Sequence, residues 1–265
     1  ERTMNKPFPW AIELARKAGD AILEVYETDF EIEEKADESP LTRADLASHN
    51  VIADGLARHD AHVPVISEED GLPDFDVRRQ WDNYWLIDPL DGTKEFVKRN
   101  GEFTVNIARI ENHKPVYGVV HVPVTGVTYV GAAGKGAWRI DGDADPVAIE
   151  VAAATPDVAR VVGSRSHQSA DVAAWLERIG NHDIIAMGSS LKFCVVAEGK
   201  ADVYPRLGLT SEWDTGAAQA VVEAAGGSVV RLDGEPLDYN NKADILNPYF
   251  IVIGSRDRDW LGASE

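Results

Sequence analysis

Residues 84–93 constrain this chain more than any other stretch, and they read YWLIDPLDGT. The apolar run 84–87 predicts a buried strand, and the strand leads directly into two carboxylates, Asp88 and Asp91. Pro89 fixes its own φ and removes one backbone N–H group. We therefore expect both acids to lie in a rigid bend at the end of a strand.

The next two residues favour a ligand-binding role for this bend. Gly92 allows a close backbone approach, and Thr93 opens a segment that could begin a helix. Carboxylates at a strand end, beside free N–H groups, suit hard cations and a phosphate. The alternative is an ordinary acidic turn, because Asp-Pro and Asp-Gly are common turn dipeptides that mostly carry no chemistry.

Composition describes an ordinary globular protein. The chain has 265 residues, of which 44% are hydrophobic and 27% are charged, enough for one large domain or two halves. No apolar stretch approaches the length needed to span a bilayer, and no secretory signal pattern opens the sequence. The single cysteine, Cys194, excludes an internal disulfide and favours a reducing, cytoplasmic location, with a peripheral position at the inner membrane as the alternative.

The net charge of −19 limits the classes of partner. It argues against nucleic acid as a partner, because phosphate backbones are held by lysine and arginine. A site for a small phosphate compound would have to reverse the negative field locally. Divalent cations and a few placed basic side chains would do so, whereas most of the acids serve solubility.

Apolar periodicity predicts two helices near the start of the chain, over residues 8–26 and 42–58. Thr42 is the expected N-cap of the second helix, and Asp45 is expected in its first turn. Capping alone could explain both residues.

Later patterns predict a layered protein. Residues 63–67 predict a strand that ends at Glu68, and residues 103–110 and 115–130 predict antiparallel strands. The second half alternates strands with helices, which favours an α/β layer covered on both faces. The expected boundary separates residues 1–155, with most candidate metal ligands, from residues 156–265.

Four acids stand out by position: Glu68, Asp88, Asp91 and Asp214, the last at a helix start. Oxygen ligands without histidine or cysteine suit Mg²⁺, with Mn²⁺ as a substitute, rather than zinc. The sequence contains neither a Walker phosphate loop nor the G-x-S-x-G pattern of serine hydrolases.

Together these motifs resemble the inositol monophosphatase superfamily of Mg²⁺-dependent, lithium-sensitive phosphatases. The resemblance spans nearly the whole chain and rests on DPLDGT at 88–93, SEE at 67–69 and WD at 213–214. Other segments are similar to the bacterial 3′(2′),5′-bisphosphate nucleotidase branch, namely DGTKEF at 91–96, NGEFTVNI at 100–107, GSSLKFC at 188–194, AEG at 197–199 and YPR at 204–206.

The resemblance implies a layered αβαβα sandwich, of mixed α+β and α/β character, and a set of metal ligands. Glu68, Asp88 and the backbone carbonyl of Leu90 would hold one ion. Asp88, Asp91 and Asp214 would hold a second, so that Asp88 bridges the two. A third, weaker ion near Glu68 would complete the site.

The resemblance also implies catalytic and substrate residues. Asp45 and Thr93 would orient and deprotonate the attacking water, with Glu68 beside them, and the N–H groups of Gly92 and Thr93 would hold the phosphate. The nucleotide and its second phosphate would contact the remaining candidates, which are His167, Ser189, Lys192 and Arg206. The alternative for Lys192 and Arg206 is that they are plain surface charges.

We therefore expect a phosphatase that removes the 3′-phosphate of adenosine 3′,5′-bisphosphate to give AMP, in sulfur assimilation. The nearest alternative is an inositol monophosphatase or a sugar phosphatase with the same metals and a different pocket. An alternative of another class is a regulator that binds nucleotide or metal without catalysis. The expected partner is the small nucleotide alone, with no protein partner, and the chain is a monomer or a homodimer.

Overall fold

The strand predicted at residues 84–87 belongs to β2 (Asn83–Asp91), which is buried over most of its length. Its side chains alternate between two apolar clusters, with Trp85 and Ile87 in one and Leu86 in the other. A strand that buries both faces needs a covering layer on each side. The computed structural model describes residues 7–28, 39–164 and 169–262 and provides both layers.

The larger sheet has seven strands in sequence order, from β1 to β7. β1 is parallel to β2, and the following strands pair antiparallel with their neighbours. The strands besides β2 are β1 (Val65–Ser67), β3 (Thr104–Glu111), β4 (Lys114–Val122), β5 (Val127–Ala132), β6 (Gly136–Asp141) and β7 (Val147–Ile149).

The smaller sheet has five strands in the order β11-β12-β10-β8-β9. β10, β8 and β9 are parallel, whereas β12 runs antiparallel to both β10 and β11. The bounds are β8 (Ala159–Gly163), β9 (His182–Ala186), β10 (Val203–Arg206), β11 (Ser228–Arg231) and β12 (Phe250–Ile253).

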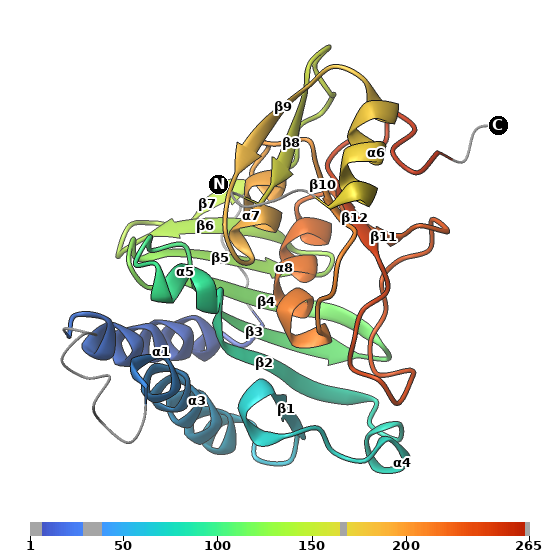
Figure 1. Ribbon diagram of the computed structural model, residues 1–265. Coiled ribbons are helices and arrows are strands. Elements are labelled where there is room, and N and C mark those ends of the chain that lie inside the picture. Colours follow the sequence, from blue (N-terminus) through green and yellow to red (C-terminus); the bar gives the residue numbers. More distant parts are fainter. Residues whose placement is uncertain (1–6, 29–38, 165–168, 263–265) are drawn as a thin grey trace.

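Helices cover both sheets in alternating layers (Figure 1). α1 (Trp10–Tyr26) and α3 (Pro40–His59) cover the outer face of the seven-stranded sheet. α7 (Leu191–Ala197) and α8 (Glu212–Ala224) lie between the two sheets, and α6 (Ala170–Ile179) packs on the far face of the five-stranded sheet. This arrangement confirms the predicted αβαβα sandwich.

Short helices connect some of the strands. η1 (Glu68–Asp70) follows β1, α4 (Phe75–Arg78) precedes β2, and α5 (Thr93–Val97) follows β2. No helix in the described ranges is both long and apolar enough to cross a membrane.

The central helix α8 approaches the seven-stranded sheet at main-chain distance. A Cβ atom at Gly118 of β4 would overlap the carbonyl oxygen of Ala217, and one at Gly131 of β5 would lie 2.6 Å from Cα of Val221. Glycine at both strand positions therefore sets how closely α8, which carries Asp214, can lie against the sheet.

The start of α3 differs from the prediction. The N-cap is Ser39, whose Oγ accepts a hydrogen bond from the Thr42 N–H, and Pro40 occupies the first helical position. Proline suits that position because its missing N–H has no partner there in any helix. Thr42 is therefore inside the helix, and Asp45 lies in the second turn rather than the first.

The bend expected at Asp88 and Asp91 is an irregularity within β2 rather than its end. β2 continues to Asp91, and its register with β3 shifts between the two acids. Two C-terminal strands, β11 and β12, were not predicted. The boundary at residue 155 stays a prediction, and the core between the sheets draws on residues from both sides of it.

Candidate active site

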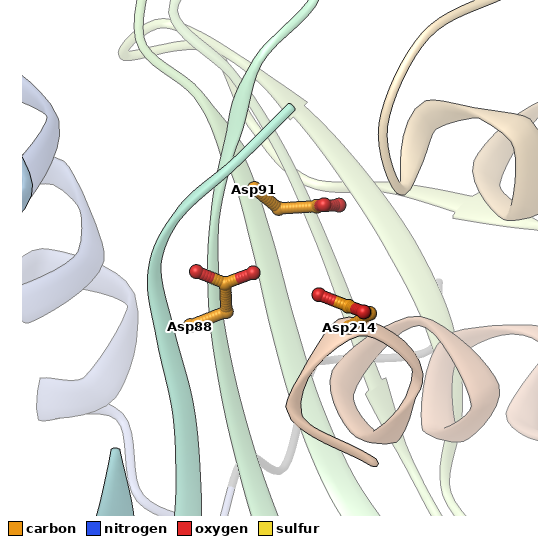
Figure 2. A group of neighbouring side chains, drawn as sticks. All are labelled: Asp88, Asp91 and Asp214. Atoms are coloured by element: carbon orange, nitrogen blue, oxygen red, sulfur yellow. The ribbon is translucent and has the colours of Figure 1, made fainter. Parts of the chain in front are cut away.

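Three carboxylates converge between the two sheets. Asp88 and Asp91 project from β2, and Asp214 projects from the first turn of α8. Figure 2 shows the three carboxylates turned toward a common space, and one oxygen atom from each lies within 4.8 Å of the others. Residues separated by more than 120 positions in the sequence thus form one oxygen-rich cluster.

Each of the three carboxylates accepts a backbone hydrogen bond through one oxygen. Leu90 N donates to Asp88 Oδ1 at 3.2 Å, Ser190 N to Asp91 Oδ2 at 2.8 Å, and Ser211 N to Asp214 Oδ2 at 2.7 Å. These bonds fix the carboxylate orientations. The second oxygen of each carboxylate has no backbone donor among these contacts.

The electrostatics of the cluster favour a bound cation. Burial, followed by the charges of Asp91, Glu68 and Asp214, raises the pKa of Asp88 well above its usual range. Burial, followed by the charge of Asp91, raises the pKa of Asp214 to about 7. A divalent cation would relieve both effects, because carboxylate oxygens are the donors that hard cations prefer.

Glu68 and Asp45 lie beside the three aspartates. Glu68 shares a hydrogen bond with Asp88; loss of hydration raises the pKa of Glu68, and this bond opposes the rise. Burial, followed by the charges of Glu69 and Glu68, raises the pKa of Asp45 to about 7. The structure thus brings Asp45 into the electrostatic range of the cluster, although α3 carries it.

Two neighbouring residues of α3 hold the segments that carry the acids. Ser48 Oγ donates to the carbonyl oxygen of Pro89 at 2.7 Å, and His49 Nδ1 bonds Ser67 Oγ at 2.9 Å. Ser48, His49 and Ser67 are buried. Pro89 precedes Leu90, and Ser67 precedes Glu68, so both bonds fix backbone next to predicted ligands.

The acids line a cleft of about 280 Å³. Most of the predicted site residues line it. They are Glu68, Asp88, Leu90, Asp91, Gly92, Thr93, Ser189, Lys192, Arg206 and Asp214, together with Ser164, Lys94 and Glu95, which were not predicted.

Three of the predicted substrate residues, Ser189, Lys192 and Arg206, line the same cleft as the acids. Ser189 has φ 47°, and its buried Oγ has no hydrogen-bond partner among the described residues. Lys192 Nζ lies 5.6 Å from the centroid of the Tyr204 ring, and a terminal nitrogen of Arg206 donates to Leu209 O at 2.9 Å. His167 lies outside the described residues.

Lys192 and Arg206 also line two adjoining cavities of about 140 and 130 Å³. Asp91 and Asp214 line the smaller of these cavities as well, whereas the larger one contains Lys192 and Arg206 without the acids. A ligand that reached from the acids into this space would need negative charge at both ends.

Three buried polar residues next to Asp91 were not predicted from the sequence. Thr104 and Asn106 of β3, together with Ser190, are fully buried and hydrogen bonded next to Asp91. A signal was available for the first two, because Thr104 and Asn106 alternate with apolar residues and so mark a polar face of a buried strand. No local signal links Ser190 to Asp91.

Comparison with known proteins agrees with the resemblance seen in the motifs. The sequence model of the Inositol monophosphatase family matches residues 6–252. The chain is 52% identical over 242 residues to the 3′(2′),5′-bisphosphate nucleotidase CysQ of Escherichia coli (strain K12), covering 91% of this chain and 96% of that protein. It is 33% identical over 248 residues to the protein of the same name from Haemophilus influenzae, covering 93% and 92%.

Solved structures give the same result. The crystal structure of CysQ from Bacteroides thetaiotaomicron, a bacterial member of the inositol monophosphatase family, superposes with a TM-score of 0.84 at 46% identity. That match covers 93% of this chain and 96% of the other. Inositol monophosphatase from Anabaena superposes with a TM-score of 0.70 at 26% identity, covering 92% and 88%.

Proposed function

Because the chain belongs to the inositol monophosphatase family and to its CysQ branch, we propose that it hydrolyses the 3′-phosphate of adenosine 3′,5′-bisphosphate. The products are AMP and inorganic phosphate, and the reaction serves sulfur assimilation. One observation carries the proposal: a single cleft is lined both by the acids that suit cations and by Lys192 and Arg206, which suit a second phosphate.

The donor set fits divalent cations. Asp88, Asp91 and Asp214 offer oxygen atoms within 4.8 Å of one another, and no ion pair formed within the described residues involves these carboxylates. We propose Mg²⁺ as the ion, with Mn²⁺ as a substitute. Glu68, Asp88 and the Leu90 carbonyl would hold one ion, Asp88, Asp91 and Asp214 would hold a second, and a third, weaker ion would bind near Glu68. Bound divalent ions supply positive charge to the phosphate and acidify a water molecule.

The chain itself positions the reacting groups. Phosphate monoesters hydrolyse so slowly that enzymes supply accelerations of up to about 10²¹, mostly through positioning and charge neutralisation. We assign the orientation of the attacking water, and acceptance of its proton, to Asp45 and Thr93 together with Glu68. The N–H groups of Gly92 and Thr93 hold the phosphate oxygens.

Lys192, Arg206 and Ser189 bind the rest of the nucleotide in this proposal, with His167 beside them. The Arg206 guanidinium offers a fork to a phosphate and Lys192 a point charge. Support comes from Lys192 and Arg206, which line both the cleft and the two adjoining cavities. The Oγ of Ser189, which has no hydrogen-bond partner in the part of the chain that the structure describes, would bond the substrate.

Phosphate release from a panel of compounds tests the proposal. With Mg²⁺ present, adenosine 3′,5′-bisphosphate should be hydrolysed faster than inositol 1-phosphate or fructose 1,6-bisphosphate. A preference for inositol 1-phosphate or the sugar bisphosphate would assign the chain to those phosphatases instead. Nucleotide binding without phosphate release from any compound would identify a regulator.

The two basic residues of the cleft have their own test. Lys192→Ala and Arg206→Ala should each raise KM for the nucleotide much more than KM for a simple sugar phosphate, because only the nucleotide carries a second phosphate. Lys200→Ala is the matched control, because Lys200 follows α7 and pairs with Glu198 away from the cleft. Equal effects on both substrates would refute the specificity role.

Other properties stay proposals of the same kind. We propose inhibition by lithium, a cytoplasmic location and a monomeric or homodimeric state without another protein partner. Inhibition by lithium chloride, cell fractionation and light scattering test these in turn.

A further inference from the structure

A buried chain of hydrogen bonds leads from β3 to Asp91, and the proposed reaction does not use it. It consists of Thr104, Asn106 and Ser190, all less than 2% exposed. In the antiparallel pair of β2 and β3, Thr104 lies opposite Asp91 and Asn106 lies opposite Asp88. Polar side chains buried in an apolar core lower the stability of the fold unless they form hydrogen bonds with one another or with a functional site.

The bonds of the chain have a defined direction. Thr104 Oγ1 donates to Asn106 Oδ1 at 2.9 Å, which orients the amide so that its nitrogen faces Ser190. Asn106 Nδ2 then donates to Ser190 Oγ at 2.8 Å. Ser190 Oγ donates in turn to Asp91 Oδ2 at 2.6 Å. Each residue therefore restricts the hydrogen position of the next one.

Ser190 holds Asp91 through two donors. Its backbone N–H and its hydroxyl both reach Asp91 Oδ2, at 2.8 and 2.6 Å, and Asn106 Nδ2 lies at 3.5 Å from the same oxygen. The hydroxyl has a single hydrogen, and the other acceptor in reach, the carbonyl oxygen of Asp214, is farther away at 3.1 Å. Because Asn106 occupies a lone pair of the hydroxyl, the hydrogen is directed to Asp91.

This geometry assigns different tasks to the two oxygens of Asp91. Oδ2 is saturated by donors from Ser190, so its lone pairs are used within the protein. Oδ1 receives no hydrogen bond from these residues, so it is the Asp91 oxygen that can be given to a cation shared with Asp88 and Asp214. A carboxylate that is fixed in this way loses less rotational freedom when a cation binds.

We propose that Thr104, Asn106 and Ser190 form a positioning relay that holds Asp91 ready to bind a divalent cation. The inference rests on the proposed function only in the choice of cation. None of the three residues is among those assigned to hold the ion, so they are positioning residues and not catalytic ones. Their removal should weaken ion binding rather than nucleotide recognition.

Thr104 provides the sharpest test because it lies three hydrogen bonds away from Asp91 along the relay. Thr104→Val removes the hydroxyl at nearly constant volume, and Thr104→Ser keeps it. The matched control is Thr128→Val, which removes another fully buried threonine hydroxyl, bonded to His121 Nδ1 at 2.8 Å and outside the site. Ser190→Ala removes the hydroxyl donor itself.

Binding of Mn²⁺, measured by electron paramagnetic resonance without nucleotide, is the readout. Loss of residues that orient a metal ligand typically weakens metal binding by about 10- to 100-fold. We expect about tenfold weaker binding for Thr104→Val, a larger effect for Ser190→Ala, and wild-type binding for Thr104→Ser and Thr128→Val. In turnover assays at saturating Mg²⁺, KM for the nucleotide should stay at the wild-type value.

Several results would overturn the relay. Wild-type Mn²⁺ affinity in both Thr104→Val and Ser190→Ala would do so, and so would equal weakening by the control Thr128→Val. Thermal unfolding in EDTA identifies any variant that fails to fold. If Ser190→Ala fails to fold, the comparison of Thr104→Val with Thr104→Ser tests the relay without it. A wild-type protein that releases no phosphate, but whose variants rank as expected for Mn²⁺, would refute the proposed function and leave the relay standing.

Discussion

The charge of Asp214 opposes folding when no cation is bound, so we predict that Asp214→Asn stabilises the metal-free protein. One Asp214 oxygen lies within 4.8 Å of oxygens of Asp88 and Asp91. At an effective dielectric constant of about 20, two unit charges at that distance repel by about 3 kcal/mol. Asparagine has nearly the same shape, and its side-chain oxygen can still accept the bond from Ser211 N.

The pKa of Asp214 gives a similar magnitude and sets the pH range. Burial, followed by the charge of Asp91, raises this pKa from 3.8 to about 7 in the folded protein, a change of about 4 kcal/mol. The folded state thus binds the proton more tightly than the unfolded state. Ionisation therefore costs stability increasingly as pH rises from about 4 to about 7, and the cost is complete above that. At about pH 8 in EDTA, we expect Asp214→Asn to raise the free energy of unfolding by about 3 to 4 kcal/mol.

Urea unfolding of the wild type and the variant, in EDTA at about pH 8 and about pH 4, measures this gain. Asp54→Asn on the exposed surface of α3 is the control and should change stability by less than about 0.5 kcal/mol. Added Mg²⁺ should stabilise the wild type and not the variant, because only the wild type binds it tightly. A variant less stable than the wild type in EDTA at the higher pH would refute the electrostatic reasoning.

Three further predictions concern other parts of the molecule. Asp88→Asn should abolish Mg²⁺-dependent phosphate release, and near-normal turnover at saturating Mg²⁺ would refute the bridging role. Burial, followed by the charge of Arg16, lowers the pKa of His121 from 6.5 to about 4. The free energy of unfolding should therefore fall by up to about 3 kcal/mol as the pH is lowered from 6.5 to 4, because the unfolded state binds the proton more readily. His121→Gln should remove this dependence in urea titrations. Gly118→Ala should destabilise the fold by about 3 kcal/mol in the same assay, because its Cβ atom would overlap Ala217 O; an unchanged midpoint would show that α8 can shift at no cost.

Local patterns predicted the parts of the fold that depend on neighbouring residues. β2 and its acids were predictable because an apolar run followed by Asp88, Pro89 and Asp91 carries its signal within ten residues. Helices α1 and α3 were predicted to within two residues at each end, because apolar periodicity over residues 8–26 and 42–58 marks their buried faces. The start of α3 was wrong because Ser39 and Thr42 are equally good capping residues, and only the position of Pro40 distinguishes them.

Long-range relations were predictable only through the family resemblance or not at all. The meeting of Asp214 with Asp88 and Asp91 requires the whole sandwich to be assembled, and no local spacing encodes it. The bond from Ser190 to Asp91 joins residues 99 positions apart. β12 was missed because its four residues, 250–253, show no alternation, being buried on both faces.

The glycines that allow α8 to contact β4 and β5 have a consequence for protein engineering. The distance between Asp214 and the acids of β2 depends on two close contacts between α8 and the sheet. Gly118 contacts main-chain atoms of Ala217, and Gly131 contacts main-chain atoms of Val221. A chimera that receives its central helix from a distant homologue would inherit the wrong spacing unless these two strand positions stay glycine. Grafting experiments should therefore exchange the helix and both strands as one unit.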